Sequence, residues 1–451
     1  MTYWINSLLF QLLFGSLESA FIWDFCGKSF EKASCQRFRI NDNEINPVND
    51  VSSQDTTVIE MCALVDFLLD IVSIETYVET ASEHLPNLFK SIVAVLSNKV
   101  KDLTPFEVTQ ALELAKKLLS KVQPAWNAWD LEASNVDSKI NEIGKEATES
   151  LSPPSDNDIP TVGIDVAKSF EKVPRAHETL MKECIDAYQE FYVTFLKSKA
   201  FHDDFDVNEH LTKLVKRPHD TLDERTRYLE QLLKGQQDSG KADNDDSDDD
   251  RVLLESLQLQ DGLHKFTPAL TLSCQILIEL SSIPTMGSSC SSSIGFGDDF
   301  SLLSYGCSPQ DLPSWLKYLI ISSCYVNGQL HPDFLLECIN TLLEIISLLD
   351  SNMKTIKPNS SPENEANFVI VMMPLITESQ YKCILKQTMI PQVITSKLWE
   401  SLGHMPASYH LQCVCLLHHL HNLVPRPKVI ETIIAKDLNN VSTYQRFTLL
   451  W

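Results

Sequence analysis

The chain has 451 residues, of which 43% are hydrophobic, and this is enough to bury large cores. Its formal net charge of -24 repels the phosphates of nucleic acids and anionic lipid headgroups, which argues against broad nucleic-acid binding. Only 13 glycines are present, so turn-rich sandwiches and barrels are disfavoured and a helical fold is expected.

The first apolar stretch runs from Tyr3 to Phe25. No lysine or arginine precedes it, and polar residues interrupt it at Asn6, Gln11, Glu18 and Asp24. These features favour a buried helix over a signal peptide or a membrane span. Direct membrane binding, with Trp4 and Phe21 at the interface, remains an alternative.

The clearest single helix is predicted to begin at Thr104 and to run to about Gln123. Thr104 can cap it, Pro105 suits its first turn, and Glu107 stands at the reciprocal capping position. Similar apolar stripes predict further helices over 58–80, 88–101 and 176–199, with a break at His84-Leu85-Pro86 between the first two.

Downstream, helices are predicted over 252–282, 313–325, 332–351, 377–386, 409–423 and 428–438, followed by a terminal run from Ser442. Only Ala366 to Met373 is strand-like. Successive amphipathic helices without an alignable repeat motif predict an all-α fold. This fold is an irregular α-solenoid of HEAT or armadillo type, or a helical bundle, with disordered acidic and Ser-rich linkers.

Composition divides the chain into five segments. Helical segments are expected at 1–149, 163–235 and 252–451, the last with loops near 284–310 and 354–367. A Ser/Pro-rich linker at 150–162 and an acidic disordered linker at 236–251 separate them. Within the acidic tract, Ser247 is a candidate phosphorylation site for an acidophilic kinase, and a purely solvating linker is the alternative.

No catalytic, cofactor-binding or metal-binding motif stands out in the sequence. There is no CxxC pair, no phosphate-binding loop and no Gly-x-Ser-x-Gly elbow. The densest group of potential ligands lies between His410 and His421, where His418 and His421 stand one helical turn apart. We therefore expect no enzyme, no cofactor and no resident metal; the alternative is a metal-dependent enzyme or metal-binding helical protein centred on His418 and His421.

Four blocks of the C-terminal half resemble the interior of Dopey family proteins: Leu312-Pro313-Ser314-Trp315-Leu316, Lys397-Leu398-Trp399-Glu400-Ser401-Leu402, the run from Cys413 to Pro425, and Tyr444-Gln445-Arg446-Phe447-Thr448-Leu449-Leu450-Trp451. The resemblance covers roughly residues 310–451 and weakens toward Val252. Because the family's Phe-x-x-Leu-Trp block continues into further helix, the resemblance implies that this chain is a fragment of a larger protein.

The same resemblance implies a non-enzymatic scaffold or adaptor in protein transport between the Golgi and endosomes. It would act through protein contacts on helical surfaces. The expected partners are a large Golgi scaffold related to Arf exchange factors, through it a phospholipid flippase complex, and a microtubule motor. The expected location is the cytosol and the periphery of Golgi, trans-Golgi network and endosome membranes, with indirect membrane association and no nucleic-acid partner.

Overall fold

The computed structural model of the chain describes residues 19–36, 57–71, 80–122, 172–215, 257, 259–288, 307–356 and 368–424. These residues fall into two compact units. Unit 1 comprises Met1–Thr194, Ser282–Ser288 and Asn364–Met373, and unit 2 comprises the remainder.

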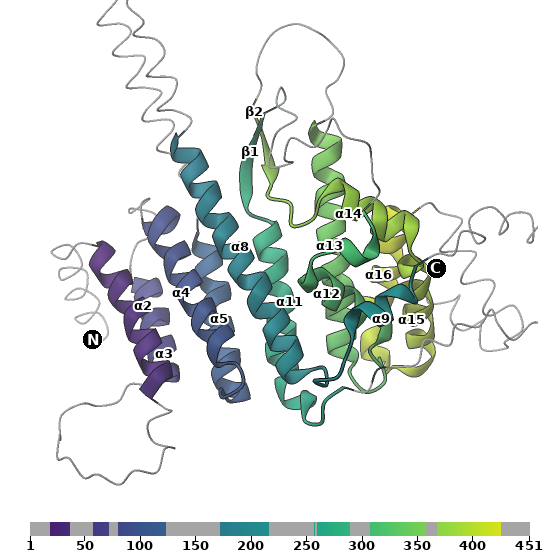
Figure 1. Cartoon of the computed structure of the whole chain (residues 1–451), viewed down its shortest axis with the longest axis horizontal. Helices are drawn as coiled ribbons and strands as arrows, with labels where there is room; N and C mark the ends of the chain where they lie inside the picture. Colours follow the sequence, from purple (N-terminus) through teal and green to yellow (C-terminus); the bar gives the residue numbers. More distant parts are fainter. Residues whose placement is uncertain are drawn as a thin grey trace, which may run out of the picture. The chain divides into compact units, whose positions relative to one another are not determined.

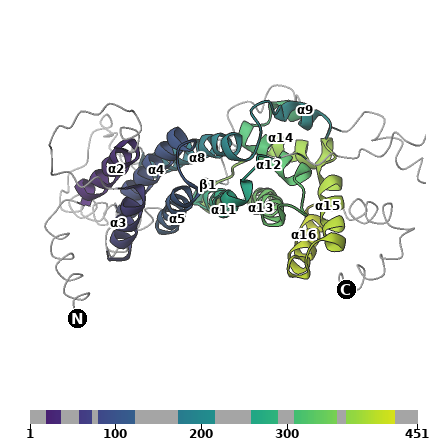
Figure 2. The ribbon, with the colours of Figure 1, turned by 90° about the horizontal axis from the view of Figure 1, so that it is seen from below.

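Unit 1 is built from helical hairpins (Figure 1). Helices α2 (Ser19–Gln36) and α3 (Val58–Ile71) form one hairpin, and α4 (Leu85–Lys99) and α5 (Pro105–Lys121) form the next. The hairpins stack in register, because α2 packs against α4 and α3 packs against α5 (Figure 2). Such stacking of helix pairs defines an α-solenoid.

Helix α5 begins as its sequence predicts. The Thr104 hydroxyl accepts a hydrogen bond from the Glu107 amide at 3.3 Å, and the Glu107 carboxylate accepts one from the Thr104 amide at 2.9 Å. The predicted break at His84-Leu85-Pro86 is wrong. A π-helical turn, η3 (Thr80–His84), runs straight into α4, which has Pro86 in its first turn.

Helix α8 (Lys172–Lys199) continues unit 1 as far as Thr194 and packs on α4. The rings of Phe89 and Tyr188 stack at 6.0 Å, and the Cys184 thiol donates to the Pro86 carbonyl at 3.3 Å. Both aromatic side chains are fully buried, so this contact belongs to the core of unit 1.

A short antiparallel ribbon also belongs to unit 1. It pairs β1 (Pro284–Ser288) with β2 (Phe368–Met372). The strand-like stretch predicted at Ala366 to Met373 thus contains a strand, β2. The loop expected near 284–310 is corrected, since its first residues form β1. A strand with the composition Pro-Thr-Met-Gly-Ser has little intrinsic preference for that state and takes it from its partner.

Unit 2 contains longer and shorter helical elements: α9 (Val207–Thr212), η4 (Leu263–Phe266), α11 (Thr267–Ser281), η6 (Pro309–Asp311), α12 (Ser314–Tyr325), α13 (Pro332–Ile356), α14 (Glu378–Lys382), η7 (Cys383–Gln387), α15 (Ile390–His404), η8 (Ala407–Tyr409) and α16 (His410–Leu423). Helices α12 and α13 form one hairpin, and α15 and α16 form the next. Again α12 packs on α15, while α13 packs on both α11 and α16. The large buried side chains Phe334 and Trp399 lie in this core.

The all-α expectation is therefore confirmed, with the small ribbon as the one addition in the described ranges. The two-helix stacking is that of an irregular α-solenoid. Helix α15 has no counterpart among the predicted helices, and the helix expected from Tyr3 to Phe25 is seen from Ser19 and extends to Gln36. The expected linkers at 150–162 and 236–251, the helix at 428–438 and the run from Ser442 to Trp451 lie outside the described residues.

Candidate protein-contact groove

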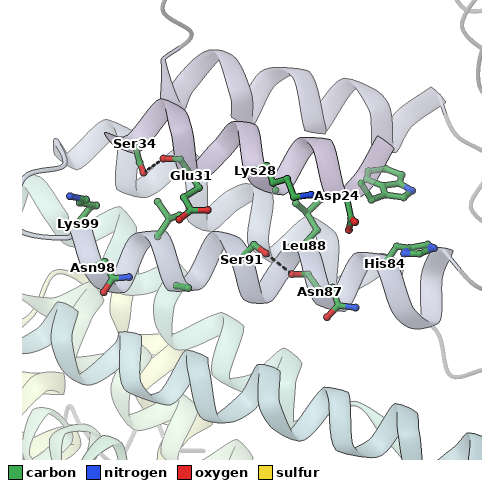
Figure 3. Close-up of a pocket in the computed structure, with 14 residues that line it drawn as sticks. Asp24, Lys28, Glu31, Ser34, His84, Asn87, Leu88, Ser91, Asn98 and Lys99 are labelled. Carbon is green, nitrogen blue, oxygen red and sulfur yellow. Dashed lines mark hydrogen bonds between the residues drawn. The ribbon is translucent and has the colours of Figure 1, made fainter. Parts of the chain in front are cut away.

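A groove of about 350 Å³ runs between α2 and α4 in unit 1. The two helices run in the same direction, so that Asp24 faces His84 and Asn87 at one end, and Ser34 approaches Asn98 at the other (Figure 3). Helix α2 contributes Trp23, Asp24, Gly27, Lys28, Glu31 and Ser34, and α4 contributes Asn87, Leu88, Ser91, Val95, Asn98 and Lys99.

The floor of this groove, which we call the α2–α4 groove, is apolar. Trp23, Leu88 and Val95 line it, and each is at most 7% exposed. A surface of this kind can take up apolar side chains of a partner segment and hold them away from water.

Gly27 gives the groove its width. A Cβ atom placed there would lie 3.5 Å from the Ser91 hydroxyl oxygen and 3.8 Å from Leu88 Cδ1, which are ordinary contact distances. A small side chain would therefore be tolerated at this position, whereas a large one would extend into the groove. The absence of a side chain keeps the space between α2 and α4 open.

The hydroxyl groups of the groove are bonded to their own helices. Ser91 donates to the Asn87 carbonyl at 3.0 Å, and Ser34 donates to the Glu31 carbonyl at 2.7 Å (Figure 3). The Asn87 amide nitrogen donates to the Glu83 carbonyl at 3.0 Å. Because these hydroxyl groups already donate protons to backbone carbonyls, the groove presents no activated serine.

The rim carries charges of both signs. Asp24 and Glu31 supply carboxylates, while Lys28 and Lys99 supply ammonium groups. Their formal charges cancel, so the rim favours neither a polyanion nor a polycation. It suits a polypeptide segment that has an apolar face and charged flanks of both signs.

The buried cysteines are poor nucleophiles. Burial raises the pKa of the Cys184 and Cys324 thiols to about 12, and that of Cys26, on α2, to about 11. These thiols are protonated at neutral pH, and a protonated thiol is a poor nucleophile and metal ligand. The Cys274 and Cys338 sulfurs lie 3.9 Å apart in the core of unit 2 and are not joined by a disulfide bond.

The histidines singled out in the sequence lie on α16, apart from the groove residues in the chain. His418 is exposed and its Nδ1 lies 3.2 Å from the Asn422 amide nitrogen, while His421 is half-buried. Nearby, His410 Nε2 lies 3.1 Å from the Met405 carbonyl oxygen. Across the described ranges, no three His, Cys, Asp or Glu side chains converge as metal ligands, so His418 and His421 have no third ligand there.

The structure tests two further sequence hypotheses only in part, because some of their residues lie outside the described ranges. Ser247 and its acidic tract lie outside the described residues. Of the membrane-interface residues, Phe21 is described and is exposed on α2. None of the helices in the described ranges is both long and apolar enough to cross a bilayer.

Sequence reasoning missed the α2–α4 groove. One signal was present: Asn87, Ser91 and Asn98 form a polar stripe along an otherwise apolar helix, at spacings that place them on one face. What the sequence did not indicate was that α2 lies alongside this stripe, because the two helices are separated by α3 and its connections.

Comparison with known proteins relates the chain to the Dopey family. Residues 313–451 match the family described as DOP1B-like, TPR repeats. The Protein DOP1B of Xenopus laevis is 23% identical over 510 residues, and that of Mus musculus is 23% identical over 515 residues; each alignment covers 98% of this chain. These matches support a member of the Dopey family, through the repeat model over residues 313–451 and through low-identity alignment along the chain.

Within the Dopey family the local similarity is higher. The Protein DOP1 homolog of Drosophila melanogaster is 36% identical over 120 residues, which is 25% of this chain. The chain spans about a fifth of the length of the curated Dopey relatives named above from frog and mouse, at 22% of each. The family description names TPR repeats, rather than the HEAT or armadillo type expected, and both are solenoids of helical units. No solved structure matches the chain.

Proposed function

We propose that this chain is part of a non-enzymatic scaffold or adaptor in protein transport between the Golgi and endosomes. The observation that carries the proposal is the stack of two-helix hairpins with an open groove along α2 and α4. Solenoids of this kind present extended surfaces for protein partners, and membership of the Dopey family supports the trafficking role.

The partners proposed are a large Golgi scaffold related to Arf exchange factors and, through it, a phospholipid flippase complex, with a microtubule motor as a further partner. The proposed location is the cytosolic face of Golgi, trans-Golgi network and endosome membranes. Attachment there would be indirect, because a formal charge of -24 opposes direct binding to anionic lipids.

The α2–α4 groove is the proposed contact site. Its apolar lining can accept apolar side chains of a partner segment. Its rim carries charges of both signs, so it favours one alignment of the partner segment in the groove rather than partners of one net charge. The serines of the groove are hydrogen-bonded to their own helices, which leaves it suited to binding rather than to chemistry.

The experiment is a pulldown from cytosol with the purified full chain as bait. Gly27→Leu is the test variant and Gly27→Ala is the matched control. Both replace glycine by a strong helix former and should raise intrinsic helix stability by roughly 1 kcal/mol, but only leucine fills the groove. Circular dichroism would verify that both variants are folded.

We expect wild type and Gly27→Ala to recover the Golgi scaffold, and Gly27→Leu to recover at least about tenfold less, which corresponds to about 1.4 kcal/mol. If even the wild-type chain recovers no Golgi scaffold, the proposed function is wrong. If all three baits recover it equally, the scaffold role stands and the groove is not the contact site.

A further inference from the structure

Three charged side chains of alternating sign follow the α2–α4 groove along α2. Asp24, Lys28 and Glu31 all line the groove and are exposed. Figure 3 shows them on α2, opposite Asn87 and Ser91 of α4. None of the three forms an ion pair with a residue that the structure describes. The groove therefore offers a partner a row of three charges, which are negative, positive and negative.

The spacing of these charges matches the pitch of a helix. Because an α-helix rises about 1.5 Å per residue, Lys28 lies about 6 Å and Glu31 about 10.5 Å beyond Asp24 along the axis of α2. A second helix along the groove can place side chains of one face at the same intervals. In an extended strand, side chains of one face recur about every 6.7 Å, so the third would lie about 13 Å from the first and would pass Glu31. The row of charges thus fits a helical partner.

The groove is too small to enclose a helix. Its volume is about 350 Å³. A helix with its side chains is about 10–12 Å wide, and a stretch of about 15 Å, the length from Asp24 to Ser34, would need more than about 1000 Å³. A partner helix therefore lies over the groove and inserts only side chains. Gly27 and Ser91 lie opposite each other in the groove and are both small, so an apolar side chain of the partner can lie over them.

We propose that the α2–α4 groove binds an amphipathic helix of a protein partner, whose contacting face carries basic, acidic and basic residues in that order, one helical turn apart. The two basic residues lie opposite Asp24 and Glu31, and the acidic residue lies opposite Lys28. This ligand class rests on the proposed function, in which the groove is the contact site for a protein partner.

The alternation of charge also disfavours other ligands. A polybasic segment would place a cation against Lys28, and a polyacidic segment or an anionic lipid surface would place negative charge against Asp24 and Glu31. Exposed ion pairs are individually weak, so the order of the charges controls selectivity more than total affinity.

Synthetic peptides provide the first test. Three fluorescein-labelled peptides of about 20 residues, based on a helix-forming Ala-rich sequence with one central leucine, are titrated with the purified full chain. The matched peptide carries Lys, Glu and Lys at the spacing of Asp24, Lys28 and Glu31. The scrambled peptide carries Lys, Lys and Glu at the same positions, and the third is the matched peptide with two prolines that prevent a helix.

Fluorescence anisotropy gives the dissociation constant of each peptide. We expect the matched peptide to bind at least about threefold more tightly than the scrambled or the proline peptide. Equal affinity for the matched and scrambled peptides would show that the order of charges is not read. Equal affinity for the matched and proline peptides would show that the ligand need not be helical. Either result overturns the proposal.

Charge reversal in the chain tests where the acidic residue of the partner lies. Lys28→Glu changes the row to three negative charges. Lys32→Glu is the matched control, because Lys32 is exposed on α2 but does not line the groove, and both substitutions change the net charge equally. We expect Lys28→Glu to bind the matched peptide at least about threefold more weakly and to prefer a peptide with three lysines, whereas Lys32→Glu behaves as wild type. Equal effects of the two substitutions would contradict the proposed contact.

These measurements distinguish the helical ligand from the proposed function. If the chain selects the matched peptide but the wild-type bait recovers no Golgi scaffold, the groove binds this class of helix and the trafficking role is wrong. If the wild-type bait recovers the scaffold and Gly27→Leu does not, while the chain shows no preference among the peptides, the proposed function stands and the helical ligand is wrong.

Discussion

Gly328 and Met405 lie so close that a side chain at position 328 would have to displace the end of the Met405 side chain. A Cβ atom on Gly328 would lie 2.5 Å from Met405 Cε and 2.8 Å from Leu335 Cδ2. Gly328 lies between α12 and α13, and Met405 ends α15, so this contact joins two successive hairpins of unit 2. Successive repeats therefore interlock at their turns as well as along their helices.

Gly328→Ala should lower the free energy of unfolding by no more than about 1 kcal/mol, because the atoms that must move are the ends of flexible side chains. Urea denaturation followed by circular dichroism measures the loss. A second variant tests the cause, since Gly328→Ala/Met405→Ala removes the obstructing methyl group and should show a coupling energy of at least about 0.5 kcal/mol. Strict additivity of the two substitutions would contradict the contact.

Thr104→Ala should cost about 1 kcal/mol, because the amide of Glu107 loses its hydrogen-bond acceptor at the start of α5. Ser120→Ala, near the end of the same helix and exposed, is the control and should change stability by less than about 0.5 kcal/mol. Thermal unfolding of both variants compares them directly. An equal loss in both would mean that the cap contributes nothing specific.

Lys117 on α5 binds Asp66 and Asp70 of α3, at 2.6 and 2.8 Å. Burial acts to lower the pKa of Lys117, but hydrogen bonds from its ammonium group to both carboxylates outweigh this and hold the pKa above its usual value. The stabilisation by these ion pairs is thus fully present below the unfolded-state lysine pKa of about 10.4. It is lost as pH rises through the higher pKa that Lys117 has in the folded state.

Because the carboxylates are about half exposed, Lys117→Met should cost no more than about 1 kcal/mol at pH 8. Denaturation of wild type and variant should be measured at each pH from 8 to 11. The difference between their free energies of unfolding should become smaller toward pH 11. A difference that grows with pH would contradict the sign of the shift.

Thiol labelling should separate the described cysteines by burial. Cys415 is exposed, whereas Cys184 and Cys324 are buried and have pKa values raised to about 12. At pH 8 a maleimide should therefore modify Cys415 first, with Cys184 and Cys324 reacting only on unfolding. Peptide mapping over time gives the order, and Cys415→Ser should remove the fast site. Labelling of Cys184 as fast as Cys415 would contradict the packing of α8 on α4.

Elements with strong local signals could be predicted from the sequence. The Thr104-x-x-Glu107 box fixed the start of α5, and Thr377 with Gln380 did the same for α14. Helix α15 was missed because Thr388-Met389-Ile390-Pro391 begins it with β-branched residues and a proline, which favour extended backbone. The tertiary packing of Leu398 and Trp399 on neighbouring helices overrides that preference.

Features that depend on distant partners could not be predicted. Strand β1 exists because Met286 pairs with Ile370, far along the chain. The α2–α4 groove likewise needs Gly27 and Ser91 to lie side by side, and no motif links them. The sequence could show that no catalytic motif was present, but it could not show where two helix faces would leave a space.

The hairpin of α2 and α3 is the outermost among the described hairpins of unit 1. It packs on α4, α5 and η3, whereas α4 also packs on α8 through Phe89 and Tyr188. The outermost hairpin should therefore open before the rest, at the cost of a single inter-repeat interface. Since α2 forms one wall of the groove, opening would abolish the contact site, and a bound partner would in turn hold the hairpin closed. Binding of a partner in the groove and folding of this hairpin are then thermodynamically linked.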